Sequence, residues 1–212
     1  TSGIARLEKD IRILANIGVN HISAYGLTVE PNTALDHLIK KKKSVPVDEN
    51  KSAEEMSWLM DFLPKLGYEQ YETSNFSLPG AEAKHNSSYW HDIPYLGIGP
   101  SAHSYKKPCR SWNPCNNMQY IRNIENGKII QESEILDSIS LYNEWIMTKI
   151  RLREGILFKD VENQFGNNIS KKFILSIERY IHSGDVLFSD DKFTLSKKGK
   201  LLTDQITSDL FL

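Results

Sequence analysis

The sequence has few cysteines and lacks long apolar runs. Only two of its 212 residues are cysteines, which is too few for a disulfide scaffold, so a reducing, cytoplasmic setting is expected. Its longest apolar runs cover a few residues, whereas a membrane-spanning helix needs roughly 20 apolar residues. The 26 Lys and Arg nearly balance the 27 Asp and Glu, which excludes a polybasic nucleic-acid arm and an acidic tail.

The sequence also lacks the features of a natural amino terminus. It begins with Thr1 and Ser2 rather than with Met, and neither a charged leader nor an apolar signal core precedes the first amphipathic segment. We therefore expect the chain to be cut from a longer protein. Hydrophobic residues make up 40% and charged residues 25%, so the chain can bury a sizeable core, and its length allows a larger and a smaller domain.

Helix and strand patterns alternate in the first part of the chain. Apolar spacing predicts a helix over 4–17, and Asp48 is expected to cap a second helix over 48–66. β-forming residues predict a strand over 21–29, buried on both sides, and another over 68–76. The order helix, strand, helix, strand favours parallel pairing in a β/α architecture.

A third strand is expected over 95–98. In β/α sheets and barrels the chemistry collects at the carboxyl ends of the strands, which are here residues 28–30, 74–76 and 99–104. The lysine run 40–43 is interpreted as a solvated face.

The pattern changes after Leu136. Three predicted helices precede a hairpin that turns at Asp190 and Asp191, and a closing helix follows; the helices cover 138–153, 158–165, 169–182 and 197–212. This order is the plan of a winged helix. Residues 136–212 contain 11 Lys and Arg and 11 Asp and Glu, so clustered positive charge for DNA is lacking and a packing or partner module is expected.

Residues 85–90, with the sequence His-Asn-Ser-Ser-Tyr-Trp, gather an imidazole, an amide, a phenol and an indole in a predicted polar loop. Such a set can ligate a metal or hold a planar aromatic ligand. The alternative is that Tyr89 and Trp90 pack this loop onto the domain while His85 and Asn86 satisfy backbone groups.

The segment from Gly97 to His103 contains a glycine pair that would let backbone approach a ligand closely. It lacks the third glycine of a dinucleotide fingerprint and the lysine of a P-loop. Ser101 and His103 share one face of an extended segment but have no evident third partner, which argues against a serine hydrolase.

Four ordered motifs together carry a resemblance to a known family. They are the strand 21–29 with Glu30-Pro31, the segment 67–76, the set His85-Asn86-x-x-Tyr89-Trp90, and residues 95–104. They closely resemble the radical S-adenosylmethionine family of oxygen-independent coproporphyrinogen III oxidases, in its oxidase-like haem chaperone branch. The resemblance covers essentially the whole chain.

The resemblance implies an α/β fold, in which residues 1–135 are the C-terminal portion of a partial, TIM-like β/α barrel and residues 136–212 a small winged-helix-like domain. It also implies a [4Fe-4S] cluster on a Cys-x-x-x-Cys-x-x-Cys loop, with S-adenosylmethionine on the fourth iron. That loop is absent, because Cys109 and Cys115 are two thiols with five residues between them. Their spacing, even with His103, fits no zinc knuckle, so free thiols are expected. We expect the chain alone to hold no cluster and to be inactive.

The resemblance also assigns site residues. Thr28 and His103 match contact positions for S-adenosylmethionine, and His103 stands where the oxidases carry an aliphatic residue. For haem, the resemblance makes His85 the candidate ligand of the iron, with neighbours Asn86, Tyr89 and Trp90.

The implied function is the handling of haem or a porphyrin, above all haem binding and delivery to a recipient protein. One alternative is a true oxidase that oxidatively decarboxylates the propionates of coproporphyrinogen III. Another is a regulatory module that uses the winged-helix plan.

Overall fold

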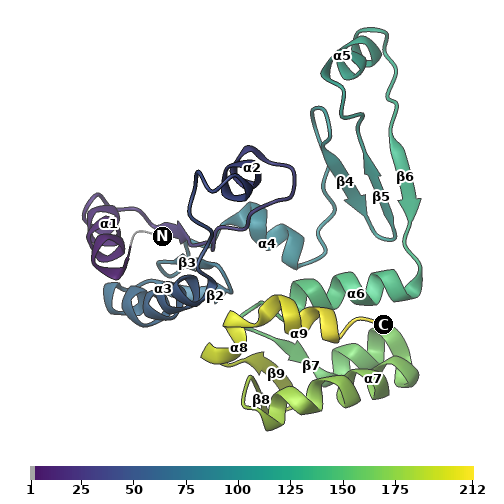
Figure 1. The fold of residues 1–212 in the computed structure, drawn as a ribbon. Helices are drawn as coiled ribbons and strands as arrows, with labels where there is room; N and C mark the ends of the chain where they lie inside the picture. The colour runs from purple at the N-terminus through teal and green to yellow at the C-terminus, as the bar shows by residue number, and fades with distance from the viewer. Residues whose placement is uncertain (1–2) are drawn as a thin grey trace.

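The structure is a computed structural model that describes residues 3–212. It contains an N-terminal lobe, an arm of three strands, and a C-terminal module of helices and a hairpin (Figure 1). Among the described residues, no helix has both the length and the apolar character needed to cross a membrane.

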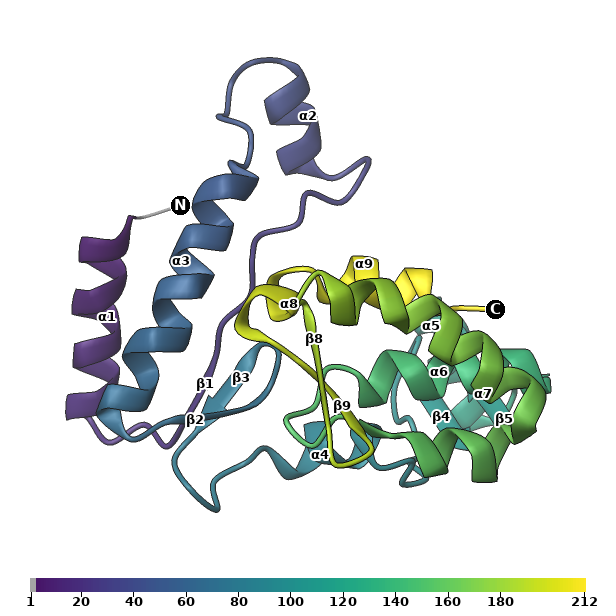
Figure 2. The same cartoon turned by 90° about the horizontal axis from the view of Figure 1, so that it is seen from below.

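The N-terminal lobe packs two helices on a small sheet. Helices α1 (Ile4–Asn16) and α3 (Glu49–Phe62) lie side by side (Figures 1 and 2). The Asp48 side chain caps α3 by accepting from Lys51 N, and Gly67 ends the following 3-10 turn η1 (Leu63–Leu66) in the left-handed region, so both predicted helices are confirmed. A short helix, α2 (Ala34–Lys40), precedes the exposed lysine run. The core of the lobe consists of Ile11, Ile22, Leu59, Met60, Phe62, Leu63, Tyr68 and Phe76.

The sheet of this lobe differs from the predicted one. Its order is β1 (His21–Ser23), β3 (Asn75–Ser77), β2 (Glu69–Glu72), and both ladders are antiparallel. The predicted single strand over 68–76 is therefore a hairpin. It turns at Thr73 and Ser74 because the Glu72 carboxylate accepts from Ser74 N at 2.8 Å. β1 and β2 run in the same direction, but β3 lies between them.

The predicted strand over 21–29 ends at Ser23. Residues 24–30 have no strand assignment and are joined to the hairpin by Ala24 N donating to Ser74 O at 2.8 Å. Tyr25 is 69% and Leu27 61% exposed, so the predicted burial on both sides is wrong here. The physical reason is that no strand within residues 3–212 pairs with this stretch.

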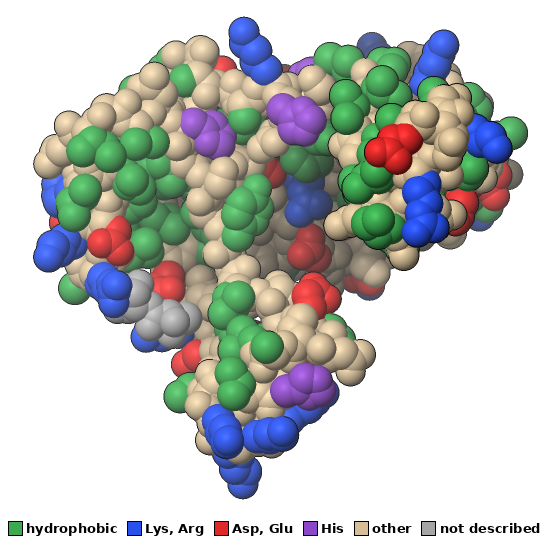
Figure 3. Space-filling model, turned by 90° about the horizontal axis from the view of Figure 1, so that it is seen from above, with side chains coloured by type: hydrophobic (Ala, Val, Ile, Leu, Met, Phe, Trp, Pro, Cys, Tyr) green, Lys and Arg blue, Asp and Glu red, His purple; other side chains and the backbone are tan. Residues whose placement is uncertain are grey.

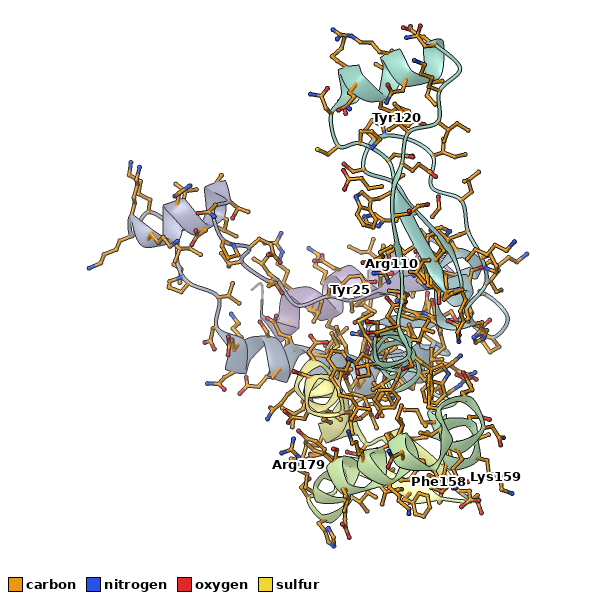
Figure 4. All side chains as sticks on the ribbon, turned by 90° about the vertical axis from the view of Figure 1, so that its right-hand side faces the viewer. Tyr25, Arg110, Tyr120, Phe158, Lys159 and Arg179 are labelled. Atoms are coloured by element: carbon orange, nitrogen blue, oxygen red, sulfur yellow. The ribbon has the colours of Figure 1, made fainter. Side chains whose placement is uncertain are left out.

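The arm was not predicted. Strands β4 (His103–Lys106), β5 (Cys109–Trp112) and β6 (Glu132–Ile135) form an antiparallel sheet, and helix α5 (Asn117–Glu125) covers its tip. Tyr120 lies on the side of α5 that faces the strands (Figure 4), and its hydroxyl accepts from Gly99 N at 3.1 Å. The predicted strand 95–98 is wrong, since Tyr95 makes only an isolated bridge to Tyr105.

The C-terminal module follows the predicted order of elements. Helix α6 (Ser138–Lys149) and strand β7 (Ile156–Leu157) precede α7 (Phe158–His182), which is interrupted at Gly166, as the two predicted helices require. Strands β8 (Val186–Ser189) and β9 (Lys192–Leu195) form the hairpin. The predicted closing helix consists of two, α8 (Lys197–Leu201) and α9 (Thr203–Asp209).

The module has a core of its own, separate from that of the N-terminal lobe. Its fully buried members include Tyr142, Ile146, Ile150, Val161, Phe173, Ile177 and Ile206. The predicted boundary between residues 135 and 136 falls between β6 and α6. The division of the chain into two domains at this boundary stays a prediction.

Asp185, which connects α7 to β8, is expected to make the module sensitive to acid. Its carboxylate accepts from the Ser183 hydroxyl and pairs with Lys198 Nζ at 3.0 Å, and these two contacts lower the pKa of Asp185 below 3.8. A lowered pKa in the folded state adds stability above the pKa of the unfolded chain, and that stability is lost as pH falls through the folded value.

We therefore expect Asp185→Asn to destabilise the chain at pH 6 and to flatten the fall in unfolding free energy between pH 5 and about pH 2. Denaturant unfolding across this range measures both effects. Asp190→Asn, in the exposed hairpin turn, is the control and is expected to keep the parent profile. If the unfolding free energy of Asp185→Asn falls with pH as steeply as that of the parent chain, Asp185 is not the source of the acid sensitivity.

Candidate functional site

A cleft of about 900 Å³ lies where the N-terminal lobe meets the C-terminal module. Its walls are residues 25–29, the first half of α3, the hairpin turn at Thr73 and Ser74, Arg151, and residues 200–205. Figure 2 shows the chain from β1 toward α2 running between α3 and the helices α8 and α9. Figure 3 shows a hollow between α2, in the N-terminal lobe, and the tip of the arm that carries α5. Basic and acidic side chains lie at the bottom of this hollow.

The hairpin turn in the cleft wall is held by a buried polar network. Glu72 is 3% exposed, and its carboxylate accepts from Ser74 N at 2.8 Å and from Asn75 Nδ2 at 2.5 Å. Asn75 in turn accepts from the Ser23 hydroxyl at 2.5 Å and donates to the Tyr25 hydroxyl at 3.4 Å. The network therefore ties the hairpin to the extended segment that carries Thr28.

The C-terminal module contributes two basic side chains, Lys200 and Arg151, to the wall of the cleft. Lys200 is half-buried and donates from Nζ to Gln70 Oε1 at 2.8 Å. Burial lowers the pKa of Lys200, and the nearby charge of Arg153 adds to this effect. Arg151 lies 3.3 Å from Asp204 Oδ1, and its guanidinium stands 5.9 Å from the centre of the Trp90 ring.

The predicted loop that contains His85 is a helix, α4 (Lys84–Trp90). One turn separates His85 from Tyr89, so they share a face: His85 Nε2 and the Tyr89 hydroxyl are 2.9 Å apart, and both side chains are exposed. The Tyr89 ring packs edge-on against the Tyr95 ring, with 4.7 Å between their centroids. The centroid of the Tyr105 ring lies 6.0 Å from that of Tyr95. An exposed imidazole with aromatic neighbours is thus available on this face.

A neighbouring face of α4 joins the rest of the protein. Asn86 contacts the Tyr71 hydroxyl, which also bonds His21 Nε2 at 2.8 Å; burial raises the pKa of Tyr71, and the Asn86 contact opposes that rise. The Trp90 carbonyl accepts from Lys149 Nζ at 2.6 Å. Asn86 and Trp90 therefore position α4, whereas His85 and Tyr89 remain accessible.

The structure separates the two residues matched to S-adenosylmethionine contacts. Thr28 lines the cleft, but His103 lies on β4, exposed, with its ring 5.8 Å from that of Trp112. Gly97 has a structural explanation: a Cβ there would stand 2.2 Å from His103 O. The close approach predicted for this glycine is thus made by the chain's own backbone.

The residues described here do not fit a [4Fe-4S] cluster. Cys109 and Cys115 are exposed free thiols, as predicted. Within residues 3–212, no group of three or more His, Cys, Asp or Glu side chains is arranged to hold a metal ion. A cluster on three cysteine ligands therefore has no site in this part of the chain.

Sequence reasoning missed Glu72, Arg151 and Lys200. A glutamate in a strand pattern gives no sign of burial, and Lys200 reaches Gln70 over 130 residues of sequence. A basic residue in a C-terminal helix has no sequence signal that places it in a cleft of the N-terminal lobe.

Comparison with known proteins shows what the chain is similar to. Residues 136–202 match the family model described as HemN C-terminal domain. The chain is 29% identical over 207 residues to heme chaperone HemW of Lactococcus lactis (97% of this chain, 54% of the relative) and 28% identical over 204 residues to that of Bacillus subtilis (96% and 54%). It is 28% identical over 218 residues to the mitochondrial radical S-adenosyl methionine domain-containing protein 1 of Danio rerio (97% and 49%).

A solved structure shows the same fold. Coproporphyrinogen III oxidase (HemN) from Escherichia coli, described as a radical SAM enzyme, superposes with a TM-score of 0.71 at 15% identity over 97% of this chain and 51% of that one. The α/β fold of the chain thus matches part of that enzyme. The chain spans about half the length of the curated relatives it matches. These matches confirm the resemblance to the oxidase-like family and its haem chaperone branch.

Proposed function

We propose that this chain is the C-terminal part of a haem-handling protein whose function is to bind haem and pass it to a recipient. The observation that carries the proposal is the similarity, over nearly the whole chain, to several proteins named heme chaperone HemW. The structural neighbour HemN supports a shared fold and, at 15% identity, gives no support for oxidase activity in this chain.

The proposal includes the architecture implied by the family. Residues 1–135 would complete a β/α barrel with preceding strands, and residues 136–212 would be a winged-helix-like domain. The exposed apolar side chains of Tyr25 and Leu27, on an extended segment beside β1, support the first part. The helices and hairpin after residue 136 support the second.

The proposed haem ligand is His85. The imidazole is exposed on α4, and the Tyr89 hydroxyl lies 2.9 Å from Nε2, so this contact orients the ring and Nδ1 is the nitrogen that would bind the iron. A histidine nitrogen is a common axial ligand of haem iron, and the rings of Tyr89 and Tyr95 offer apolar contact to a macrocycle. Asn86 and Trp90 would hold α4 in place.

S-Adenosylmethionine fits the cleft in part. Thr28 contributes a hydroxyl to the wall, and Gly26 beside it leaves open space where a side chain would stand. Bound to a cluster, this cofactor supplies radical chemistry. The part of the chain described here has no ligands for a cluster, so we derive no reaction step.

A haem titration tests the proposed ligand. We expect His85→Ala to weaken haem binding by at least about tenfold and to change the Soret band, because the iron loses its protein nitrogen. His182→Ala removes another exposed helical histidine and is expected to bind haem as the parent chain does. Tyr89→Phe should keep the ligand while losing its orienting hydroxyl. Equal spectra and affinities for His85→Ala and the parent would remove His85 from the proposal.

A further inference from the structure

Lys200 differs from the neighbouring lysines of the same helix in having no anionic partner. Lys197 Nζ pairs with Asp61 at 2.6 Å, and Lys198 Nζ pairs with Asp185 at 3.0 Å. Lys200 bonds only the neutral Gln70 amide oxygen, and no carboxylate of residues 3–212 forms an ion pair with it. Among these three lysines, it is Lys200 that lines the cleft.

This arrangement is electrostatically costly. A partly buried ammonium loses hydration. A hydrogen bond to a neutral amide oxygen offsets less of this loss than a hydrogen bond to a carboxylate would. Burial accordingly lowers the pKa of Lys200. An anion that enters the cleft would restore the missing interaction and favour the charged form of the lysine.

Arg151 adds a second cation to the same cleft. Its side chain is 22% exposed, whereas its partner Asp204 is 92% exposed, so solvent screens this ion pair and leaves guanidinium donors for a ligand. Glu49 and Asp204 also line the cleft, but neither pairs with Lys200 within the described residues. The hydroxyls of Thr28 and Ser74 also line the cleft and can donate to a ligand.

We propose that Lys200, assisted by Arg151, binds a carboxylate of the ligand in this cleft. The inference rests on the proposed function, which offers two sources of that group: a propionate of haem or a porphyrin, and the amino-acid carboxylate of S-adenosylmethionine. Arg151 matches carboxylate geometry with a planar fork of donors, and Lys200 contributes a compact charge.

Calorimetric titration of the full chain with four probes tests the inference. Haem and haem dimethyl ester differ by their free propionates, whereas S-adenosylmethionine and methylthioadenosine differ by the amino-acid group. We expect Lys200→Met to weaken one of the two carboxylate-bearing ligands by about tenfold and to leave its carboxylate-free analogue unchanged. The affected pair identifies the source of the carboxylate.

Lys197→Met is the matched control, since it removes a lysine of the same helix that points to Asp61 outside the cleft. It should leave all four affinities unchanged. Thermal unfolding separates a binding role from a structural one, because removal of an unpaired, half-buried ammonium should not lower stability.

The outcomes distinguish the two proposals. Ligand binding by the parent chain together with unchanged affinities in Lys200→Met overturns the carboxylate site and leaves the proposed function standing. A loss of stability in Lys200→Met with no selective effect on ligands assigns the residue to packing and also overturns the site. If the parent chain binds neither haem nor S-adenosylmethionine, the proposed function and this inference fail together.

Discussion

Replacing Glu72 with alanine should lower the free energy of unfolding by about 3 kcal/mol. The buried Glu72 carboxylate is the acceptor for both Ser74 N and Asn75 Nδ2, at 2.8 and 2.5 Å. Alanine would leave these two donors without their acceptor, and each buried unsatisfied donor costs about 1–3 kcal/mol. Denaturant unfolding, followed by circular dichroism, measures the loss.

The same substitution should disturb the cleft, because Thr73 and Ser74 form part of its wall. Glu69→Ala is the control: it removes the same residue type from the same strand, but Glu69 is exposed and pairs with Arg153 at the surface. A surface pair of this kind contributes about 1 kcal/mol or less. Equal losses for Glu72→Ala and Glu69→Ala would show that the hairpin does not depend on the buried network.

The helices could be predicted because their signals are local. Asp48 caps α3, Gly67 ends the turn that follows it, and Gly166 separates the two helices merged in α7. The hairpin after β8 could be predicted for the same reason, since Asp190 and Asp191 both adopt positive φ at its turn.

Strand pairing could not be predicted in the same way, because it depends on distant segments. The sequence 68–76 alternates as a strand does, but it turns back at Thr73 and Ser74, where Ser74 N donates to the Glu72 carboxylate and Gln70 Nε2 donates to Thr73 O. Tyr95 and its neighbours have strand-forming composition, but the backbone of the arm strand β4 pairs with this segment at Tyr95 alone. Composition indicates which residues suit a strand and does not indicate their partners.

Helix α4 lacked a local signal. Its first residue follows Ala83, whose side chain cannot cap the helix, and the segment contains two serines, which favour turns. Contacts from distant residues stabilise it instead: Tyr71 with Asn86, and Lys149 with the Trp90 carbonyl. The residue types at 85–90 could therefore be singled out from the sequence, but their two faces could not.

The candidate site likewise combines a residue that the sequence indicated with residues that depend on contacts between distant segments. Thr28 was singled out by the family resemblance, as a contact position for S-adenosylmethionine, and it lines the cleft. Lys200 and Arg151 reach the cleft because the C-terminal module packs against the N-terminal lobe, through contacts such as Arg153 N with Tyr71 O and the bridge between Leu152 and Glu72. A site between two separately packed cores is determined by their docking, which no local pattern describes.

Replacing Gly199 with alanine should destabilise the chain by about 3 kcal/mol, although alanine is the better helix former. Gly199 lies in α8 at a φ that alanine can adopt, so propensity alone would give a gain of about 1 kcal/mol. A Cβ at this position would stand 1.9 Å from the Asp185 carbonyl oxygen, however. Because that atom belongs to the backbone, no side-chain rotation relieves the overlap.

The chain around Gly199 leaves α8 little room to move. The Asp185 carbonyl accepts from Ser196 N at 2.9 Å, and the Ser196 hydroxyl accepts from Gly199 N at 3.1 Å, so a shift of the helix breaks the cap that begins it. Chemical denaturation measures the effect, and Gly26→Ala, where a Cβ meets open space, should leave stability nearly unchanged. A stabilised Gly199→Ala variant would contradict the close packing. Since Lys200 is the next residue, Gly199→Ala should also weaken the carboxylate-bearing ligand, whereas Lys200→Met weakens that ligand at parental stability.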